Sequence, residues 1–269
     1  MSLLVRPQSP DAEGVVINIT PENAGWTYVG FRVLKLAAGR RYECRELDRE
    51  TCLVVLTGTV SVQAGGEFHP DLGGRRSVFD GQPAAIYLPA DLPYVIAAES
   101  EAEVAICTAP GSGEGAVRVL RPEAVEVRGA GANTRHVRNI LAEGDGVAQS
   151  LLVVEVITPG GHWSSYPPHK HDRDAVPEES LLEETYYHRL SPPQGFAFQR
   201  VYTDDRSIDE AVVAHDGDVV MVPRGYHPVG APHGYDLYYL NVMAGPTRRW
   251  VFQNDPDHDW IVRRQDTEQ

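Results

Sequence analysis

One segment of the chain occurs twice, and this repeat limits the folds that the chain can adopt. Asp80-Gly-Gln-Pro-Ala-Ala-Ile-Tyr-Leu-Pro89 is echoed by Asp216-Gly-Asp-Val-Val-Met-Val-Pro223. Each copy places an acidic residue and a glycine before a short apolar run that stops at proline. That pattern is typical of a turn followed by a buried strand. The repeat therefore predicts a duplicated unit, with one copy in each half of the chain.

The composition favours β-structure throughout. The 269 residues include 25 glycines and 20 prolines, and short runs of Val, Ile, Leu and Tyr recur between turn residues. Helix is expected only in two brief stretches, Asp174 to Leu182 and near Ile208 to Ala211. We expect an all-β protein with two domains, residues 1–120 and 121–269. The seam should lie between two glycine-rich segments, residues 111–115 and 129–133.

The C-terminal half carries residues with the chemistry of a metal site. His169 and His171 are separated by one residue, so in an extended strand both side chains point to the same face. His227 follows the repeated strand after a Pro-x-Gly turn, where a second strand end can bring it to the same place. Glu183 and Glu184 follow His171, and either could supply a carboxylate. Imidazole and carboxylate together favour one divalent ion. The equivalent part of the first half has no such histidines and is expected to hold no metal.

These segments resemble the two signature motifs of the cupin superfamily, whose metal is usually held by three histidines and one glutamate. The resemblance implies a bicupin, a pair of double-stranded β-helix (jelly-roll) domains with a metal only in the C-terminal one. Here an acidic insert from Asp172 to Leu182 separates the second histidine from the glutamate. A strand period of two puts only one of Glu183 and Glu184 on the ligand face, and the resemblance favours Glu184. The implied ligands are His169, His171, Glu184 and His227. We expect zinc, with manganese or iron as alternatives.

Longer matches narrow the resemblance to one family. They are Thr158-Pro-Gly-Gly-His-Trp-Ser-Ser-Tyr-Pro-Pro-His-Lys-His-Asp172, Phe198-Gln-Arg-Val-Tyr202, Pro223-Arg-Gly-Tyr-His227 and Tyr238-Tyr-Leu-Asn241. These segments resemble the 5-deoxy-glucuronate isomerase family of myo-inositol catabolism, which is related to the uronate ketol-isomerases. The resemblance is close over residues 116–269 and weak before them, and it departs at His162, where asparagine is expected. It implies an intramolecular oxidoreductase that converts 5-deoxy-glucuronate to the ketose 5-dehydro-2-deoxy-gluconate.

Aldose-ketose isomerisation suits such a metal site. Loss of the C2 proton places negative charge on the C1 oxygen, which a Lewis acid with open coordination positions can stabilise. The acid/base candidates are Tyr186 and His188, which share a strand face with Glu184 by alternation, and His233, which follows His227 closely. Two other functions stay open: an Fe(II) cupin dioxygenase with the same ligands, and a non-catalytic sugar-binding bicupin.

The net charge of −14, without a cluster of Lys or Arg, argues against nucleic acid and anionic membranes as partners. We expect a small-molecule sugar acid as the partner, and a homo-oligomer is compatible with the sequence. The acidic protein would repel the carboxylate of such a substrate unless the pocket supplies local positive charge. Arg200 and Lys170 are the candidates for that cation, with Tyr238 as a further substrate-binding residue.

No apolar run approaches the roughly 20 residues of a membrane span, and the first residues lack the features of a signal peptide. Cys44, Cys52 and Cys107 are odd in number and lack zinc-knuckle spacing, so free thiols are expected. These features predict a cytoplasmic protein.

Overall fold

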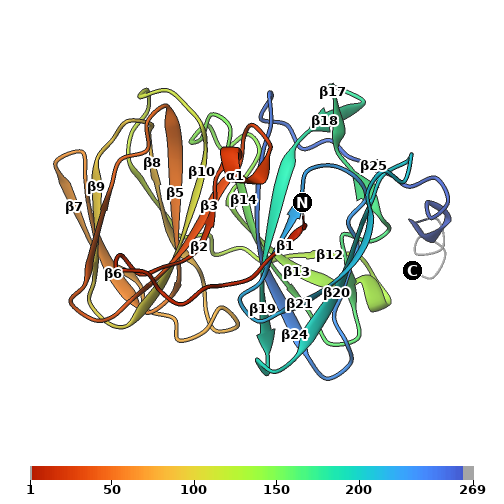
Figure 1. Ribbon diagram of the computed structural model, residues 1–269, viewed down its shortest axis with the longest axis horizontal. Coiled ribbons are helices and arrows are strands. Elements are labelled where there is room, and N and C mark those ends of the chain that lie inside the picture. Colours follow the sequence, from red (N-terminus) through yellow and green to blue (C-terminus); the bar gives the residue numbers. More distant parts are fainter. Residues whose placement is uncertain (1, 263–269) are drawn as a thin grey trace.

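The computed structural model describes residues 2–262 and contains two β-bodies packed side by side (Figure 1). Each body is built from two antiparallel sheets, the arrangement of a jelly roll. The N-terminal body, red to yellow-green in Figure 1, combines a six-stranded and a four-stranded sheet. The C-terminal body, green to blue, combines a seven-stranded and a four-stranded sheet with two small two-stranded sheets. The expected all-β fold of two jelly-roll domains is confirmed.

The six-stranded sheet of the N-terminal body has the order β11-β8-β5-β10-β3-β2. Its strands are β2 (Val15–Ile19), β3 (Gly30–Leu36), β5 (Arg49–Thr57), β8 (Ala84–Leu88), β10 (Ala102–Pro110) and β11 (Arg118–Leu120). The facing sheet has the order β4-β9-β6-β7. Its strands are β4 (Arg41–Cys44), β6 (Thr59–Ala64), β7 (Glu67–Gly73) and β9 (Tyr94–Ala98).

The seven-stranded sheet of the C-terminal body has the order β1-β22-β19-β24-β14-β13-β12. Its strands are β1 (Leu4–Val5), β12 (Glu126–Arg128), β13 (Arg135–Leu141), β14 (Leu152–Thr158), β19 (Glu183–Ser191), β22 (Val219–Val222) and β24 (Asp236–Ala244). The facing sheet, in the order β15-β23-β20-β21, contains β15 (Trp163–Ser164), β20 (Phe196–Tyr202), β21 (Asp209–His215) and β23 (Val229–Gly230). The small pairs are β16 (His169–Lys170) with β25 (Gln253–Asn254), and β17 (Asp172–Ala175) with β18 (Glu179–Leu181). Short helical turns are α1 (Pro21–Ala24) and a 3-10 turn (Gly131–Asn133).

The repeated sequence occupies the same place in both bodies. β5 pairs with β8 so that Thr51 lies opposite Leu88, the residue before the proline of the first repeat. β19 pairs with β22 so that Glu184 lies opposite Val222, the residue before the proline of the second repeat. Thr51 is therefore equivalent to Glu184, and β3, β5, β8 and β10 correspond to β14, β19, β22 and β24. The duplicated unit predicted from the repeat is confirmed.

The large sheets of the two bodies pack against each other and form one shared apolar core. Phe31 on β3 and Tyr187 on β19 meet across this interface, with ring centroids 5.8 Å apart. Because side chains alternate along a strand, the other face of each large sheet points into its own body. The inner faces of β19 and β24 thereby line the interior of the C-terminal body.

Both stretches expected to be helical are strands. The acidic insert from Asp172 to Leu182 forms the β17–β18 hairpin, in which the buried Glu179 carboxylate accepts the backbone N–H of Asp172 at 2.7 Å. The segment near Ile208 leads into β21, which pairs along its length with β20. Both stretches are too short for a helical pattern to outweigh strand pairing, which tertiary contacts decide.

The N-terminal segment belongs to both bodies. Sheet membership changes between Leu120 and Glu126, because β11 pairs with β8 and β12 pairs with β13. The expected first domain began at residue 1, yet β1 pairs with β22 of the C-terminal body, with Leu4 opposite Val220. Residues 4–5 therefore lie in a sheet of the C-terminal body rather than in the expected first domain. No helix within residues 2–262 is long and apolar enough to cross a membrane.

Candidate metal centre

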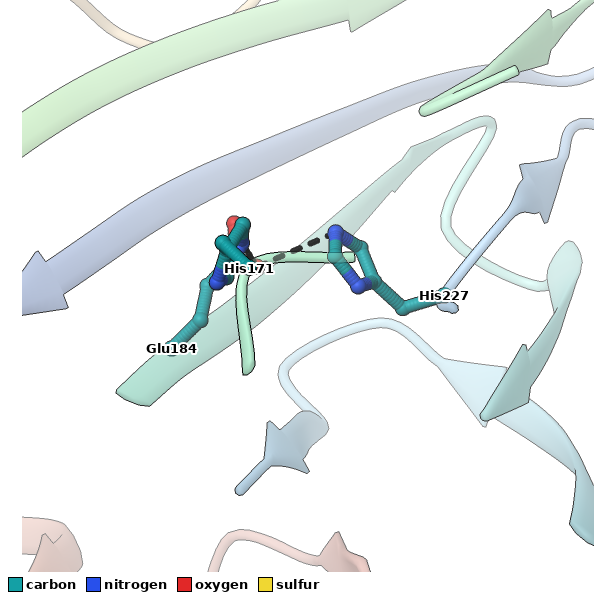
Figure 2. Close-up of side chains that lie close together, drawn as sticks. All are labelled: His171, Glu184 and His227. Atoms are coloured by element: carbon teal, nitrogen blue, oxygen red, sulfur yellow. Dashed lines mark hydrogen bonds and ion pairs between the residues drawn. The ribbon is translucent and has the colours of Figure 1, made fainter. Parts of the chain in front are cut away.

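Three strand ends bring two imidazoles and one carboxylate together inside the C-terminal body. His171 follows β16, Glu184 lies at the start of β19, and His227 lies in the loop before β23. One ligand atom from each lies within 4.8 Å of the other two. Figure 2 shows the three side chains pointing toward one another. All three are buried, so the cluster is a site rather than a surface coincidence.

Backbone carbonyls fix the orientation of both imidazoles. His171 Nδ1 lies 3.0 Å from the Leu182 carbonyl oxygen, and His227 Nδ1 lies 2.8 Å from that of Gly225. A carbonyl only accepts, so each Nδ1 carries a proton and each Nε2 of a neutral ring presents a lone pair. Glu184 Oε2 is 3.1 Å from His171 Nε2 and 3.2 Å from His227 Nε2. Despite that distance, the buried His227 Nε2 makes no hydrogen bond to any residue in the described range 2–262. Electron-rich atoms that converge in this way suit a bound divalent cation.

The protonation states agree with a cation site. Burial would raise the pKa of Glu184, but His227, His171 and the Asn241 amide lower it to about 2, so the carboxylate stays ionised. Burial lowers the pKa of His227 more than Glu184 raises it. At His171 burial is outweighed by the hydrogen bond and charge of Glu184, which raise the pKa. Asn241 donates its amide N–H to Glu184 Oε1 and fixes the carboxylate. Metal binding would replace the protons that otherwise balance this carboxylate.

His169 lies beside the three converging groups. Its ring centroid is 4.9 Å from that of His227 and 6.4 Å from that of His171. Phe252 packs against the ring at a centroid distance of 4.6 Å. Burial, with the neighbouring imidazoles, lowers the pKa of His169 well below its usual range, so the ring is neutral and able to bind a metal. His169 is thus close to the cluster but outside the group whose ligand atoms lie within 4.8 Å of one another.

The register of β19 separates the two rival glutamates. Glu184 faces the interior of the C-terminal body and joins the cluster. Glu183 faces the opposite way, and its carboxylate accepts backbone N–H groups of residues 27–29 in the N-terminal body. Strand alternation, as expected, admits only one of the two to the site.

A cavity of about 570 Å³ opens beside the cluster. Tyr186 on β19 and Tyr239 on β24 form part of its wall, with ring centroids 4.8 Å apart. Consecutive serines bond to their hydroxyls: Ser164 to Tyr239 at 2.6 Å and Ser165 to Tyr186 at 2.9 Å. Ser165 has a φ of 49°, a conformation that non-glycine residues rarely adopt and that often marks a functional site. Burial raises the pKa of both tyrosines, so both hydroxyls stay protonated near neutral pH.

Arg135, at the start of β13, brings positive charge to the cavity wall. Its guanidinium donates to the Asn133 carbonyl oxygen at 3.2 Å and forms no ion pair within residues 2–262. Gly129 leaves room for this contact, because a Cβ there would lie 2.1 Å from the Asn133 carbonyl oxygen and 2.8 Å from Arg135 Nη1. The other arginine of the wall, Arg128, already pairs with Glu126 at 2.8 Å. Arg135 was not among the residues expected from the sequence, because no motif spacing places β13 beside the strands that carry the cluster.

The two expected substrate-binding cations lie away from the cavity. Lys170 points away from its two histidine neighbours because strand alternation reverses it, and its Nζ bonds to Asp204 at 2.6 Å. Arg200 lies on the outer face of β20 and forms two hydrogen bonds to Asp209 at 2.8 and 2.9 Å. Neither side chain lines the cavity. The expectation that one of them faces the pocket is corrected by these contacts.

Three other predicted residues also lie outside the cavity lining. Tyr238 faces the core shared by the two bodies, where its hydroxyl donates to Glu155 at 3.1 Å. His188 shares the inner strand face as expected, but it is fully buried, and its Nε2 lies 3.0 Å from Gln199 Oε1. Burial lowers the pKa of His188 to about 4, so the ring is neutral. His233 is exposed in the turn before β24.

His162, at the position where asparagine was expected, connects two loops near the site. Its Nδ1 lies 3.0 Å from the Thr134 carbonyl oxygen, immediately before Arg135. An asparagine amide could donate the same kind of hydrogen bond, so the substitution preserves the contact type.

Comparisons with known proteins place the chain in a family. The model of the KduI/IolB family matches residues 3–261. The 5-deoxy-glucuronate isomerase of Geobacillus kaustophilus strain HTA426 is 54% identical over 266 residues, covering 97% of this chain and 96% of that protein. The enzyme of the same name from Bacillus subtilis strain 168 is 50% identical over 268 residues, covering 97% of this chain and 99% of that protein.

Solved structures agree at the level of the fold. An IolB-like protein from Salmonella typhimurium LT2 superposes with a TM-score of 0.93 at 48% identity, covering 97% of this chain and all of that one. The oxalate decarboxylase of Lactobacillus farciminis superposes with a TM-score of 0.68 at 14% identity, covering 98% and 90% of the two chains, which shows a shared fold alone. The family resemblance found in the sequence motifs is confirmed, and the chain belongs to the KduI/IolB family.

Proposed function

We propose that this protein is a 5-deoxy-glucuronate isomerase, which converts 5-deoxy-glucuronate to 5-dehydro-2-deoxy-gluconate. Relatives that carry this name align along nearly the whole chain at about half identity. The observation that carries the proposal is a cluster of His and Glu side chains that could hold a cation, beside a cavity whose wall also holds Arg135, which forms no ion pair within residues 2–262. The substrate has a hydroxy aldehyde at one end and a carboxylate at the other. The cavity offers a matching group for each end, and its volume suits a small sugar acid.

The cluster would hold one divalent ion, with His171, Glu184 and His227 as ligands and His169 as a fourth. We favour zinc, which commonly takes imidazole and carboxylate ligands, while manganese and iron accept the same donors. A bound ion would supply Lewis-acid stabilisation of the negative charge that develops on the substrate oxygens. The Asn241 amide and the carbonyls behind the imidazoles hold the ligands in orientation, a role that outer-shell groups play at many metal sites.

Arg135 would bind the substrate carboxylate. Its guanidinium is at the cavity wall and makes one hydrogen bond to the described part of the chain, at the Asn133 carbonyl oxygen. A planar guanidinium matches a carboxylate with two parallel hydrogen bonds. This contact also overcomes the repulsion between an anionic sugar and a chain of net charge −14. Arg135 therefore replaces Arg200 and Lys170 as the proposed ligand of the substrate carboxylate.

Tyr186 would donate a hydrogen bond from its hydroxyl group to a substrate oxygen. Of the three acid/base candidates, Tyr186 lines the cavity, His188 is buried beneath it and His233 is exposed. Burial keeps the Tyr186 hydroxyl protonated, and Ser165 orients it at 2.9 Å. A protonated hydroxyl can donate a hydrogen bond to the substrate oxygen that carries negative charge in the enediolate.

A cytoplasmic location fits this role in sugar-acid catabolism. Cys52 and Cys107 lie directly opposite each other on β5 and β10, and both are free and buried. A reducing compartment keeps such a pair as thiols.

Proton exchange tests the proposed reaction most simply. The metal-loaded protein is incubated with 5-deoxy-glucuronate in deuterated water, and the C2 position of the substrate and the C1 position of the ketose are followed by NMR. We expect deuterium to enter both positions and ketose to accumulate. Oxygen uptake without ketose formation would favour the dioxygenase alternative. Saturable binding without exchange or turnover would favour the sugar-binding alternative.

A further inference from the structure

Two glutamates occupy equivalent positions at the start of equivalent strands. The strand pairings that align Thr51 with Glu184 also align Glu50 on β5 with Glu183 on β19. Strand alternation turns both glutamates away from the interior of their own body and toward the other body. Glu50 is fully buried and Glu183 is 7% exposed.

Each carboxylate accepts three consecutive backbone N–H groups from the opposite body. Glu183 accepts those of residues 27, 28 and 29 at 2.6, 2.6 and 3.0 Å. Glu50 accepts those of residues 149, 150 and 151 at 2.8, 2.7 and 2.6 Å. The two donor segments lead into β3 and β14, which are themselves equivalent strands. The bodies are therefore joined by a reciprocal pair of contacts, which we call the Glu183 clasp and the Glu50 clasp.

The two clasps differ in what lies next to them along the chain. Leu182, immediately before Glu183, provides the carbonyl that orients His171. Glu184, immediately after it, provides the carboxylate of the metal cluster. The residue after Glu50 is Thr51, which has no such role. A shift of the Glu183 backbone would therefore move two parts of the cluster at once, whereas the same shift at Glu50 would move none.

We infer that Glu183 is a positioning residue of the metal centre, and that the N-terminal body helps to shape the site through it. Three N–H groups held by one carboxylate are charge-assisted hydrogen bonds, which are stronger than neutral ones. They hold residues 182–184 in register from outside the C-terminal body. The N-terminal body thus contributes to the site without providing a ligand. The inference rests on the metal site of the proposed function but not on the identity of the substrate.

Matched substitutions test this role, because the Glu50 clasp provides an internal control. Glu183→Gln and Glu50→Gln each replace one acceptor oxygen with an amide that opposes backbone N–H groups. The binding of Co²⁺ to the metal-free proteins is measured by chelator competition, together with the visible absorption of the bound Co²⁺ and the melting temperature. We expect both variants to melt at lower temperature. Only Glu183→Gln should bind Co²⁺ more weakly, by about 10-fold, and shift the absorption bands, as outer-shell changes do at metal sites.

Equal Co²⁺ affinity in the two variants would overturn the inference, whether both match the wild type or both are weakened alike. If Glu183→Gln does not fold, the clasps can be weakened from the donor side. Thr27→Pro removes one N–H from the Glu183 clasp, and Gln149→Pro removes one from the Glu50 clasp. The inference requires that Thr27→Pro weaken Co²⁺ binding more than Gln149→Pro does. None of these readouts uses the uronate, so a failure of the isomerase assignment would leave the Co²⁺ comparison intact.

Discussion

The two jelly rolls share one scaffold but fill it differently. In the N-terminal body, β5 and β10 turn Leu53, Val55 and Ile106 inward, and each is at most 2% exposed within an apolar core. The equivalent positions on β19 and β24 are Tyr186, His188 and Asn241. One interior is therefore a packed core, and the other contains a cavity beside polar side chains.

A few inward-facing positions therefore determine whether a body has a packed apolar interior or a polar one with a cavity. The sheets, the repeated strand and the glutamate clasps are common to both bodies. None of these features explains why, among the described residues, the cluster occurs only in the C-terminal body. Three inward polar side chains of the C-terminal body have a specific partner: Ser165 for Tyr186, Gln199 for His188 and Glu184 for Asn241. Such pairing is what makes buried polar groups tolerable in a core.

The largest effect on metal binding should come from removing one of the proposed metal-binding side chains of the C-terminal body. We expect His171→Ala to lose stoichiometric metal, with affinity reduced by more than about 100-fold, beyond the effect of most outer-shell changes. Isomerase turnover should fall with metal content. Elemental analysis of the purified variant and its activity measure both. His233→Ala, which changes an exposed histidine of the same body, should keep both metal and turnover. Full metal content in His171→Ala would refute the proposed site.

A second prediction concerns Arg135, the proposed ligand of the substrate carboxylate in the cavity of the C-terminal body. Arg135→Ala should lower kcat/KM for the uronate by roughly 10- to 100-fold, the size of one charged hydrogen bond felt in the transition state. Arg200→Ala, which removes a surface ion pair, should stay within about twofold of the wild type. Steady-state kinetics on the acid and on an uncharged analogue separate the two cases. If Arg135→Ala lowered kcat/KM equally for the acid and for the analogue, Arg135 would not be the residue that binds the substrate carboxylate.

The sequence was enough for the duplicated all-β fold, because a repeat and short apolar runs are local signals. It also located the cluster, because His-x-His and a histidine after a strand end are tied to strand geometry. It failed for Arg135, Lys170 and Arg200. Whether a strand face points into a cavity depends on which sheet neighbours it receives, and that is a tertiary property. The crossing of β1 into the C-terminal body was invisible for the same reason.

A third prediction transfers a residue of the packed interior into the cavity-bearing one. Asn241→Ile installs the side chain of the equivalent Ile106 and removes the amide that holds Glu184. Metal affinity should fall by about 10-fold, as expected for loss of an outer-shell hydrogen bond. Met243→Leu changes the residue opposite Glu184 on β24 without touching that bond and should bind metal within about twofold of the wild type. Chelator competition gives both values, and identical affinities in the two variants would argue against the role of Asn241.

The smallest effect is on the pH dependence of stability and comes from His188, a buried histidine whose equivalent in the N-terminal body is Val55. Burial lowers the pKa of His188 from 6.5 to about 4. The unfolded chain then binds a proton that the folded chain does not, so the free energy of unfolding should fall as the pH drops from 6.5 toward 4. The full loss is about 3 kcal/mol, at about 1.4 kcal/mol per pH unit.

Replacing His188 with valine, the residue at the equivalent Val55 position, should flatten this dependence. Urea denaturation of the metal-free protein and of His188→Val across that pH range measures the two slopes. Gln199 loses its partner in the variant, so absolute stability near neutral pH should also decrease, and the slopes are the quantity to compare. A slope unchanged by the substitution would mean that His188 titrates normally in the folded protein.

The central claim is that the polar interior of the C-terminal body is where this protein binds its metal. A crystal structure of the zinc-loaded protein, with anomalous diffraction recorded at the zinc absorption edge, tests it most directly. We predict one strong peak, with His171 Nε2, His227 Nε2 and the Glu184 carboxylate at about 2.0 to 2.2 Å from it. A peak inside the N-terminal body, or no peak beside Glu184 in protein that turns over the uronate, would contradict the account.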